Sequence, residues 1–194
     1  VAPGGGPFIV DRNGATYLAS SPAAEHTPYE VTVEEQGPVR VVIGAKGWYH
    51  DANGAPLCMY QTRIIAYAGL PFFRVKHRTI VTFDSRKNQL ADVGFAVPIQ
   101  PDPTYTWFEE DGGQPLYIRP KTDNWTAFLH QDRHDHFRYL FNDGTAPADA
   151  DLPVLMEGAR AAGTTNALHR RAMRTSLIVR DFWQKFPKEL ELRP

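Results

Sequence analysis

The sequence predicts an all-β fold, an antiparallel β-sandwich with long connecting loops and little helix. Turn signals such as Asn13-Gly14, Asn53-Gly54 and Asn142-Asp143-Gly144 recur at short spacing. The runs between these turns are rich in Val, Ile, Thr, Tyr and Phe, which favour strands. None of these runs is followed by a helical pattern of about 10 to 15 residues, which argues against a parallel sheet. A barrel is the structural alternative.

The predicted strands follow one another along the chain. The stretch WYHDANGAPLCMY predicts two strands joined by a tight hairpin, because Asn53-Gly54 suits a turn with positive φ at both central positions. Residues 100–114 and 143–153 are predicted to be long loops, where binding residues tend to lie. The expected strands are 7–11, 15–19, 28–35, 38–50, 56–67, 71–83, 89–99, 115–119, 124–131, 136–142, 155–161 and 172–180.

Length and charge limit the class of protein. The 194 residues predict a single domain over 1–194, with 1–6 as a flexible N-terminal tail. The 21 Lys and Arg nearly balance 22 Asp and Glu, so the total charge gives no support for nucleic-acid or membrane binding. The lone Cys58 cannot form an internal disulfide. No apolar run approaches the roughly 18 residues of a membrane helix, and neither a cofactor motif nor a nucleophile elbow is present.

A basic stripe is predicted in PFFRVKHRTIVTF, residues 71–83. With a strand period of two, Arg74, Lys76 and Arg78 share one face, and the neighbouring predicted strand adds Arg63. Such a stripe suits a polyanion, since each cation can meet a carboxylate. The alternative is a solvated sheet face on which glutamates from a neighbouring strand pair with the cations. His77 falls on the opposite, apolar face, which favours a hydrogen-bonded core histidine over a catalytic one.

The stretch HQDRHDH, residues 130–136, is the second candidate. On one continuous strand its alternate residues would form a weak set of candidate metal ligands, namely His130, Asp132, His134 and His136. The flanking apolar runs WTAFL and FRYLF favour a turn at this place, which would scatter those side chains. A solvated hairpin tip and a sugar-contacting loop that uses His134 are the other interpretations, and no bound metal or cofactor is expected.

Aromatic side chains are the third feature. A flat ring can pack on the C–H face of a pyranose, and Trp107, in the predicted loop 100–114, is the best placed of them. The alternative is that these rings pack in the core. They are Trp48, Tyr49, Tyr60, Tyr67, Trp107, Trp125 and Trp183.

Three segments together resemble the central β-sandwich domain of the exo-rhamnogalacturonan lyase family, also described as PcRGLX-like or YetA-like. The resemblance covers about residues 28–100 and 155–192. The segments are VTVEEQGPVRVVIGAKGWYHDANGAPLCMYQTRIIAYAGLPFFRVKHRTIVTFD, LADVGFAVP and SLIVRDFWQKFPKELEL. In that family the sandwich is flanked by an N-terminal barrel-like domain and followed by a helical toroid.

The resemblance implies a polysaccharide lyase that acts on rhamnogalacturonan, or a related uronate-containing glycan, by β-elimination. It implies that this chain is part of a larger multidomain protein, supports the catalytic toroid and is inactive alone, with catalytic residues unknown. Uronate glycans and flanking domains are the expected partners. An extracellular or periplasmic location is expected, with a cytoplasmic one as the alternative. A non-catalytic carbohydrate-binding module and a structural spacer are the alternative functions.

The last residues carry a separate expectation. Residues 181–194 are expected to lead out of the domain towards the helical toroid, with Pro187 preventing a long helix. Trp183 and Phe186 are then expected to be partly exposed at the domain edge, where another domain would cover them.

Overall fold

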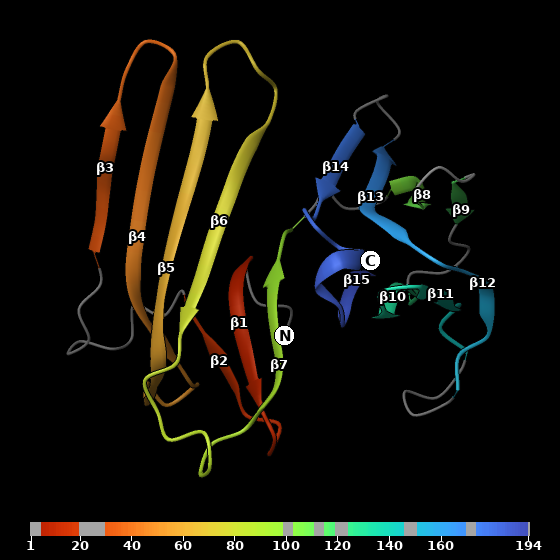
Figure 1. Ribbon diagram of the computed structural model, residues 1–194, viewed down its shortest axis with the longest axis horizontal. Helices are drawn as coiled ribbons and strands as arrows, with labels where there is room; N and C mark the ends of the chain where they lie inside the picture. The colour runs from red at the N-terminus through yellow and green to blue at the C-terminus, as the bar shows by residue number, and fades with distance from the viewer. Residues whose placement is uncertain are drawn as a thin grey trace. The chain divides into compact units, whose positions relative to one another are not determined.

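The computed structural model describes residues 5–19, 30–98, 103–110, 115–118, 124–145, 151–169 and 174–193 (Figure 1). The chain divides into two compact units, residues 1–98 and 99–194. The prediction of one domain over 1–194 stays a prediction. Every strand pair is antiparallel, and the only helix of the described residues is the short 3₁₀ segment η1 (Trp183–Lys185), so the predicted all-β class is confirmed. No described helix has the length and apolar character needed to cross a membrane.

The first unit is a single curled sheet. Its strand order is β6-β5-β4-β2-β1-β7. β3 pairs with β4 on the edge that does not face β5, beside the short pairing of β4 with β2. The strands are β1 (Gly6–Asp11), β2 (Thr16–Leu18), β3 (Glu30–Gln36), β4 (Arg40–His50), β5 (Pro56–Tyr67), β6 (Phe73–Ile80) and β7 (Leu90–Ala96).

Two turns of this unit share the pattern Asp-x-Asn-Gly-Ala. In the predicted hairpin between β4 and β5, the Asp51 carboxylate accepts hydrogen bonds from the backbone N–H groups of Asn53 and Ala55, at 2.9 and 2.8 Å. Gly54 takes a positive φ of 82°, but Asn53 does not, so this hairpin has a longer turn than the two-residue type expected. Asp11 plays the same part between β1 and β2. Asx-type hydrogen bonds therefore set both turns.

One end of the curled sheet contains a small core. Tyr49 and Cys58 are fully buried there, and the Tyr60 hydroxyl donates to the carbonyl oxygen of Ala19 at 2.9 Å. The core residues are Ile9, Ala19, Tyr49, Cys58 and Tyr60, with Tyr17, Leu57, Phe83 and Leu90 packed against them.

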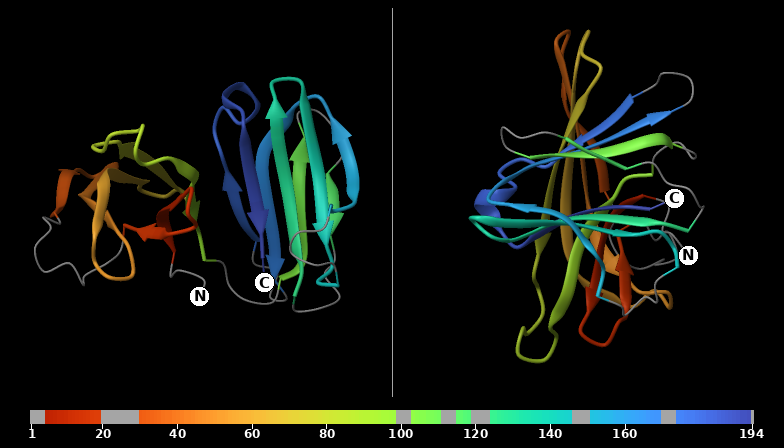
Figure 2. Two further views of the ribbon diagram at one scale, coloured as in Figure 1. Left: turned by 90° about the horizontal axis from the view of Figure 1, so that it is seen from below. Right: turned by 90° about the vertical axis from the view of Figure 1, so that its right-hand side faces the viewer.

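The second unit is a two-layer sandwich (Figure 2). One sheet has the order β12-β11-β10-β15 and the other β14-β13-β8-β9. The strands are β8 (Pro103–Glu110), β9 (Leu116–Ile118), β10 (Thr126–Arg133), β11 (His136–Asn142), β12 (Val154–Gly158), β13 (Ala161–His169), β14 (Arg174–Ile178) and β15 (Lys188–Leu192).

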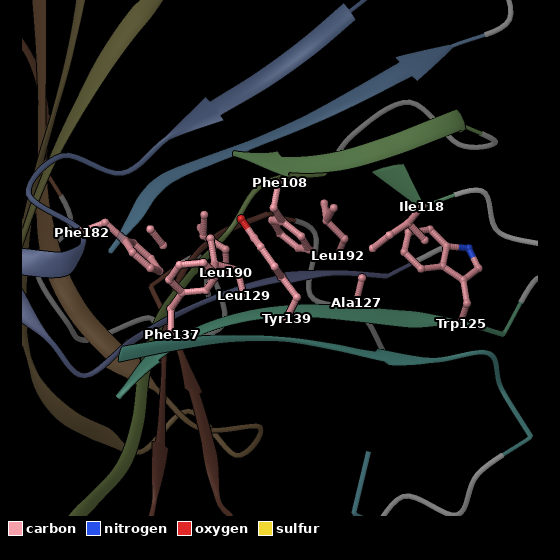
Figure 3. Packing of buried hydrophobic residues seen from close by; sticks show 11 residues of the cluster. Phe108, Ile118, Trp125, Ala127, Leu129, Phe137, Tyr139, Phe182, Leu190 and Leu192 are labelled. Carbon is pink, nitrogen blue, oxygen red and sulfur yellow. The ribbon is translucent and has the colours of Figure 1, made fainter. Parts of the chain in front are cut away.

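Aromatic and aliphatic side chains from both sheets fill the space between the layers (Figure 3). Phe108 of β8 stacks on Tyr139 of β11 with ring centroids 5.4 Å apart. Phe182, just before η1, is 1% exposed and belongs to the same core. The alternation of buried and exposed residues along β10 and β15 gives this sheet its apolar inner face.

Three parts of the sequence prediction differ from the structure. The expected loop 100–114 contains β8, the expected strand 155–161 is split between β12 and β13, and residues 188–192 form β15. The prediction that 172–180 is the last strand is therefore wrong, because β15 follows it and pairs with β10. Leu190 and Leu192 supply buried contacts that anchor the end of the chain to the sandwich.

Candidate functional site

The β6 strand presents cations on one face and apolar groups on the other. Across the β5–β6 ladder, Arg74 lies opposite Ile65, Lys76 opposite Arg63 and Arg78 opposite Gln61. Directly paired residues of an antiparallel ladder share a face, so the three β6 cations form one row along an edge strand. We call Arg74, Lys76 and Arg78 the β6 stripe, and its predicted alternation is confirmed.

Other cations on this face are paired with glutamates of β3. Lys46 contacts Glu30 at 2.9 Å, Arg63 contacts Glu34 at 2.5 Å, and Arg40 contacts Glu35. The Arg63 hydrogen bond lowers the pKa of Glu34. These three ion pairs are of the kind that the sequence suggested as an alternative, in which glutamates of a neighbouring strand pair with the cations. The paired cations lie on β4 and β5, however, and not on β6.

A bulge and a glycine make these pairs possible. The β3–β4 register shifts between Val33 and Glu35, so the consecutive residues Glu34 and Glu35 both reach cations of this face. The Glu34 carboxylate crosses β4 above Gly44, where an added Cβ would lie only 2.6 Å from Glu34 Oε1. Glu34 can therefore reach Arg63 on β5, two strands away from its own strand.

The β6 stripe has no such partner within the described residues. No hydrogen bond or ion pair joins Arg74, Lys76 or Arg78 to any residue of that part of the chain, and all three are exposed. Neighbours on one face of a strand stand about 6.6 to 7 Å apart. The stripe is thus a row of free, evenly spaced donors for anionic groups.

His77 lies on the opposite face of β6 and belongs to a hydrogen-bond network. Its Nε2 lies 2.6 Å from the Tyr49 hydroxyl, and its Nδ1 lies 2.8 Å from Thr62 Oγ1. Burial lowers the pKa of His77, which favours the neutral ring. His77 is hydrogen-bonded as expected, but its side chain is only partly buried.

The stretch 130–136 forms a hairpin tip. The turn residues His134 and Asp135 connect β10 to β11, as the flanking apolar runs predicted. His134 is exposed, and its ring centroid lies 6.3 Å from that of Phe186.

The weak metal candidates do not converge. His130 Nδ1 lies 2.9 Å from Glu189, while His136 lies 2.7 Å from Asp132 and 3.4 Å from Glu157. Burial raises the pKa of Asp132, but the His136 hydrogen bond and nearby cations outweigh it and leave that pKa lowered. Among the described residues, no three His, Cys, Asp or Glu side chains are arranged to hold a metal ion.

Three of the seven candidate rings belong to the cores. Tyr49, Tyr60 and Trp125 are buried, which confirms packing for these three. Trp107 lies in β8 and not in a loop, and its side chain is outside the described part of the structure. Trp183 is partly exposed and Phe186 is 44% exposed, as predicted for the end of the chain.

Two further residues were missed by sequence reasoning. Arg160 lies in the turn between β12 and β13, and its guanidinium carbon lies 4.4 Å from the centroid of the Trp183 ring. Gln131 is fully buried and hydrogen-bonded to two turns. No local pattern marks either residue, because both act through contacts distant in sequence.

The comparison with protein families bears on the same region. Residues 18–107 match the family model described as the PcRGLX-like protein central beta sandwich domain. The match supports the resemblance of this part of the chain to the PcRGLX-like family. The match includes β6 and its stripe, and identifies a β-sandwich domain of a rhamnogalacturonan lyase-like protein. The matched range does not include 155–192, whose resemblance stays a prediction. No curated protein matches the chain.

Proposed function

We propose that the chain serves a multidomain polysaccharide lyase that cleaves rhamnogalacturonan, or a related uronate-containing glycan, by β-elimination, and that the β6 stripe binds carboxylates of this substrate. The observation that carries the proposal is that Arg74, Lys76 and Arg78 have no hydrogen-bond or ion-pair partner among the described residues. On the same face, glutamates neutralise Arg40, Lys46 and Arg63. The match of residues 18–107 to the PcRGLX-like central β-sandwich domain supports the choice of glycan.

The geometry of the stripe suits an extended acidic chain. β6 is the edge strand of its path in the sheet and its three cations are exposed, so a linear polymer can lie along their row. Arg74 and Arg78 can each bind a carboxylate through two parallel N–H groups, and Lys76 adds a point charge between them. Because the groups are exposed, salt should weaken the binding strongly.

The proposal gives this chain a binding role and no cleavage of its own. β-Elimination needs a base to remove a proton next to the uronate carboxylate and an acid to protonate the leaving oxygen. On the same face, the residues of β5 that pair directly with the stripe are Gln61, Arg63 and Ile65, and none of them suits the role of base. His77 contacts the Tyr49 hydroxyl on the other face, whereas Tyr67 of β5 lies on the face of the stripe, directly opposite Arg40 of β4.

A second candidate function, a structural spacer, is favoured by a different observation. Val33, Ile43, Ile64 and Val75 pair directly across four strands and form one apolar row on the face opposite the stripe. All four are more than a third exposed. Such contiguous apolar surface is typical of a contact with another protein domain.

The test is binding of rhamnogalacturonan to the 194-residue chain, measured by titration calorimetry. The triple variant Arg74→Gln, Lys76→Gln, Arg78→Gln should lose about tenfold or more in affinity, because each cation forms charge-assisted hydrogen bonds. The ultraviolet absorbance of unsaturated products should stay flat with the chain alone.

A matched control removes two Arg and one Lys elsewhere in the same unit. The variant Arg12→Gln, Arg86→Gln, Lys87→Gln changes the net charge equally, at exposed turn positions. It should bind like the wild type. Equal losses in the two variants would show only a general charge effect and would overturn the proposal, and no binding at all would favour the spacer.

A further inference from the structure

We propose a second saccharide site, at the loop end of the second unit, where Arg160 holds the carboxylate of a uronic acid and Phe186 supports its ring. Three loops meet there. Arg160 lies over Trp183, with its guanidinium carbon 4.4 Å from the ring centroid, and the ring centroids of His134 and Phe186 lie 6.3 Å apart. We call these four residues the loop-end platform.

Buried contacts hold the loops of the platform together. Gln131 is fully buried, and its Nε2 donates to the carbonyl oxygens of Arg133 at 2.6 Å and Ala159 at 3.1 Å. Its Oε1 accepts from the N–H of Ala161 at 2.9 Å. One side chain thus joins the β10–β11 turn to the β12–β13 turn, and such rigidity lowers the entropy cost of binding.

The third loop, around η1, has its own anchors. Phe182 is buried in the sandwich core, directly before Trp183. Lys188 Nζ donates to the carbonyl oxygen of Asp181 at 3.1 Å, which ties the start of the loop to β15. Trp183 is the first residue of η1 and Phe186 directly follows its last, so both rings belong to this one loop.

Arg160 is prepared to bind an anion. A guanidinium that lies over an aromatic ring can use its flat face for that contact and keep its N–H edges available for a carboxylate. No carboxylate contacts Arg160 in the described residues. Lys185 and Arg180, by contrast, share Asp181 at 3.1 and 3.8 Å.

The exposed rings of the platform indicate that the carboxylate bound by Arg160 belongs to a sugar. Phe186 is 44% exposed, and the side chain of His134 is 63% exposed, so both rings are accessible. An exposed ring presents an apolar face that can pack against the C–H groups of a pyranose. A pyranose that carries a carboxylate is a uronic acid. A neutral saccharide lacks the group that Arg160 is proposed to bind.

This site shares its ligand class with the proposed function but uses none of its residues. The β6 stripe lies in the first unit and the platform wholly in the second. Either site can therefore fail without the other.

The test follows the indole N–H signal of Trp183 by NMR during titration of the full 194-residue chain with trigalacturonate. The Trp183→Phe variant identifies that signal among those of the four tryptophans. We expect a saturable shift with trigalacturonate and none with a neutral galactose trisaccharide. Arg160→Gln should weaken binding about tenfold, since it removes a charge-assisted bidentate contact.

Arg180→Gln is the matched control, since Arg180 is 90% exposed and close in sequence to η1. It should leave the affinity within about twofold of the wild type. The β6 triple glutamine variant should leave the Trp183 shift intact, whatever happens to polymer binding. An absent Trp183 shift, an Arg160→Gln variant that binds like the wild type, or an equal response to the neutral trisaccharide would each overturn the proposal.

Discussion

Replacement of Gln131 by leucine tests the packing of the second unit most sharply. Leucine has a similar volume but makes no hydrogen bonds, so the change removes polar contacts without opening a large cavity. Gln131 is fully buried, and Ala161, whose N–H donates to Gln131 Oε1 at 2.9 Å, is also fully buried.

The expected cost follows from the groups left behind. A buried N–H without a partner costs about 1–3 kcal/mol, and each hydrogen bond lost to a water-accessible carbonyl costs about 0.5–1.5 kcal/mol. The two N–H groups of the Gln131 amide are shared by the carbonyl oxygens of Arg133, His136 and Ala159; Arg133 and Ala159 are exposed, so two hydrogen bonds count at the lower figure. We therefore expect Gln131→Leu to lower the free energy of unfolding of the second unit by about 2–4 kcal/mol.

The assay is urea unfolding, followed by circular dichroism and tryptophan fluorescence. Trp125 is buried in the core of the same unit, so its fluorescence is expected to change when that core unfolds. Gln184→Leu is the control, because Gln184 is exposed on η1 in the same unit, and it should change the stability by less than about 0.5 kcal/mol. A loss below about 1 kcal/mol for Gln131→Leu would refute the reasoning.

The remaining predictions concern the first unit. Because burial lowers the pKa of His77 below its ordinary 6.5, the unfolded state binds a proton first, and stability should fall as pH drops below that value; in denaturant titrations at several pH values, His77→Gln should flatten this dependence. Burial raises the pKa of Cys58 to about 11, so a thiol reagent should label it only after unfolding, and fast labelling of the folded chain would contradict this. Glu34→Gln should free Arg63 opposite Lys76 and raise the affinity for polygalacturonate in calorimetry; unchanged affinity would show that Arg63 takes no part.

The strands with a clear period of two could be predicted from the sequence. The predicted bounds 56–67 agree with β5, because a turn signal precedes this run and its alternate residues are apolar. The β8 strand was missed because Pro101 and Pro103 suggested a loop, whereas its place is set by pairing with β13 and β9. Residues 188–192 alternate correctly, but Glu, Leu and Lys are also helix formers, so only the pairing with β10 defines β15.

The sequence predicts on which face the β6 cations lie, but not which cations pair with glutamates. A strand period of two places Arg74, Lys76 and Arg78 on one face. Arg63 forms an ion pair with Glu34. This pair depends on the β3 bulge and on the space above Gly44, neither of which is visible in the sequence. Arg160 and Phe186 come from different loops, so their platform depends on the tertiary fold.

The central claim is that the β6 stripe recognises the carboxylates of an acidic glycan. Its most direct test compares binding of the chain to polygalacturonate and to the same polymer after full methyl esterification, by calorimetry at low salt. The account predicts binding to the acid form, weakened by salt and lost on esterification. Equal affinity for the esterified polymer would contradict it.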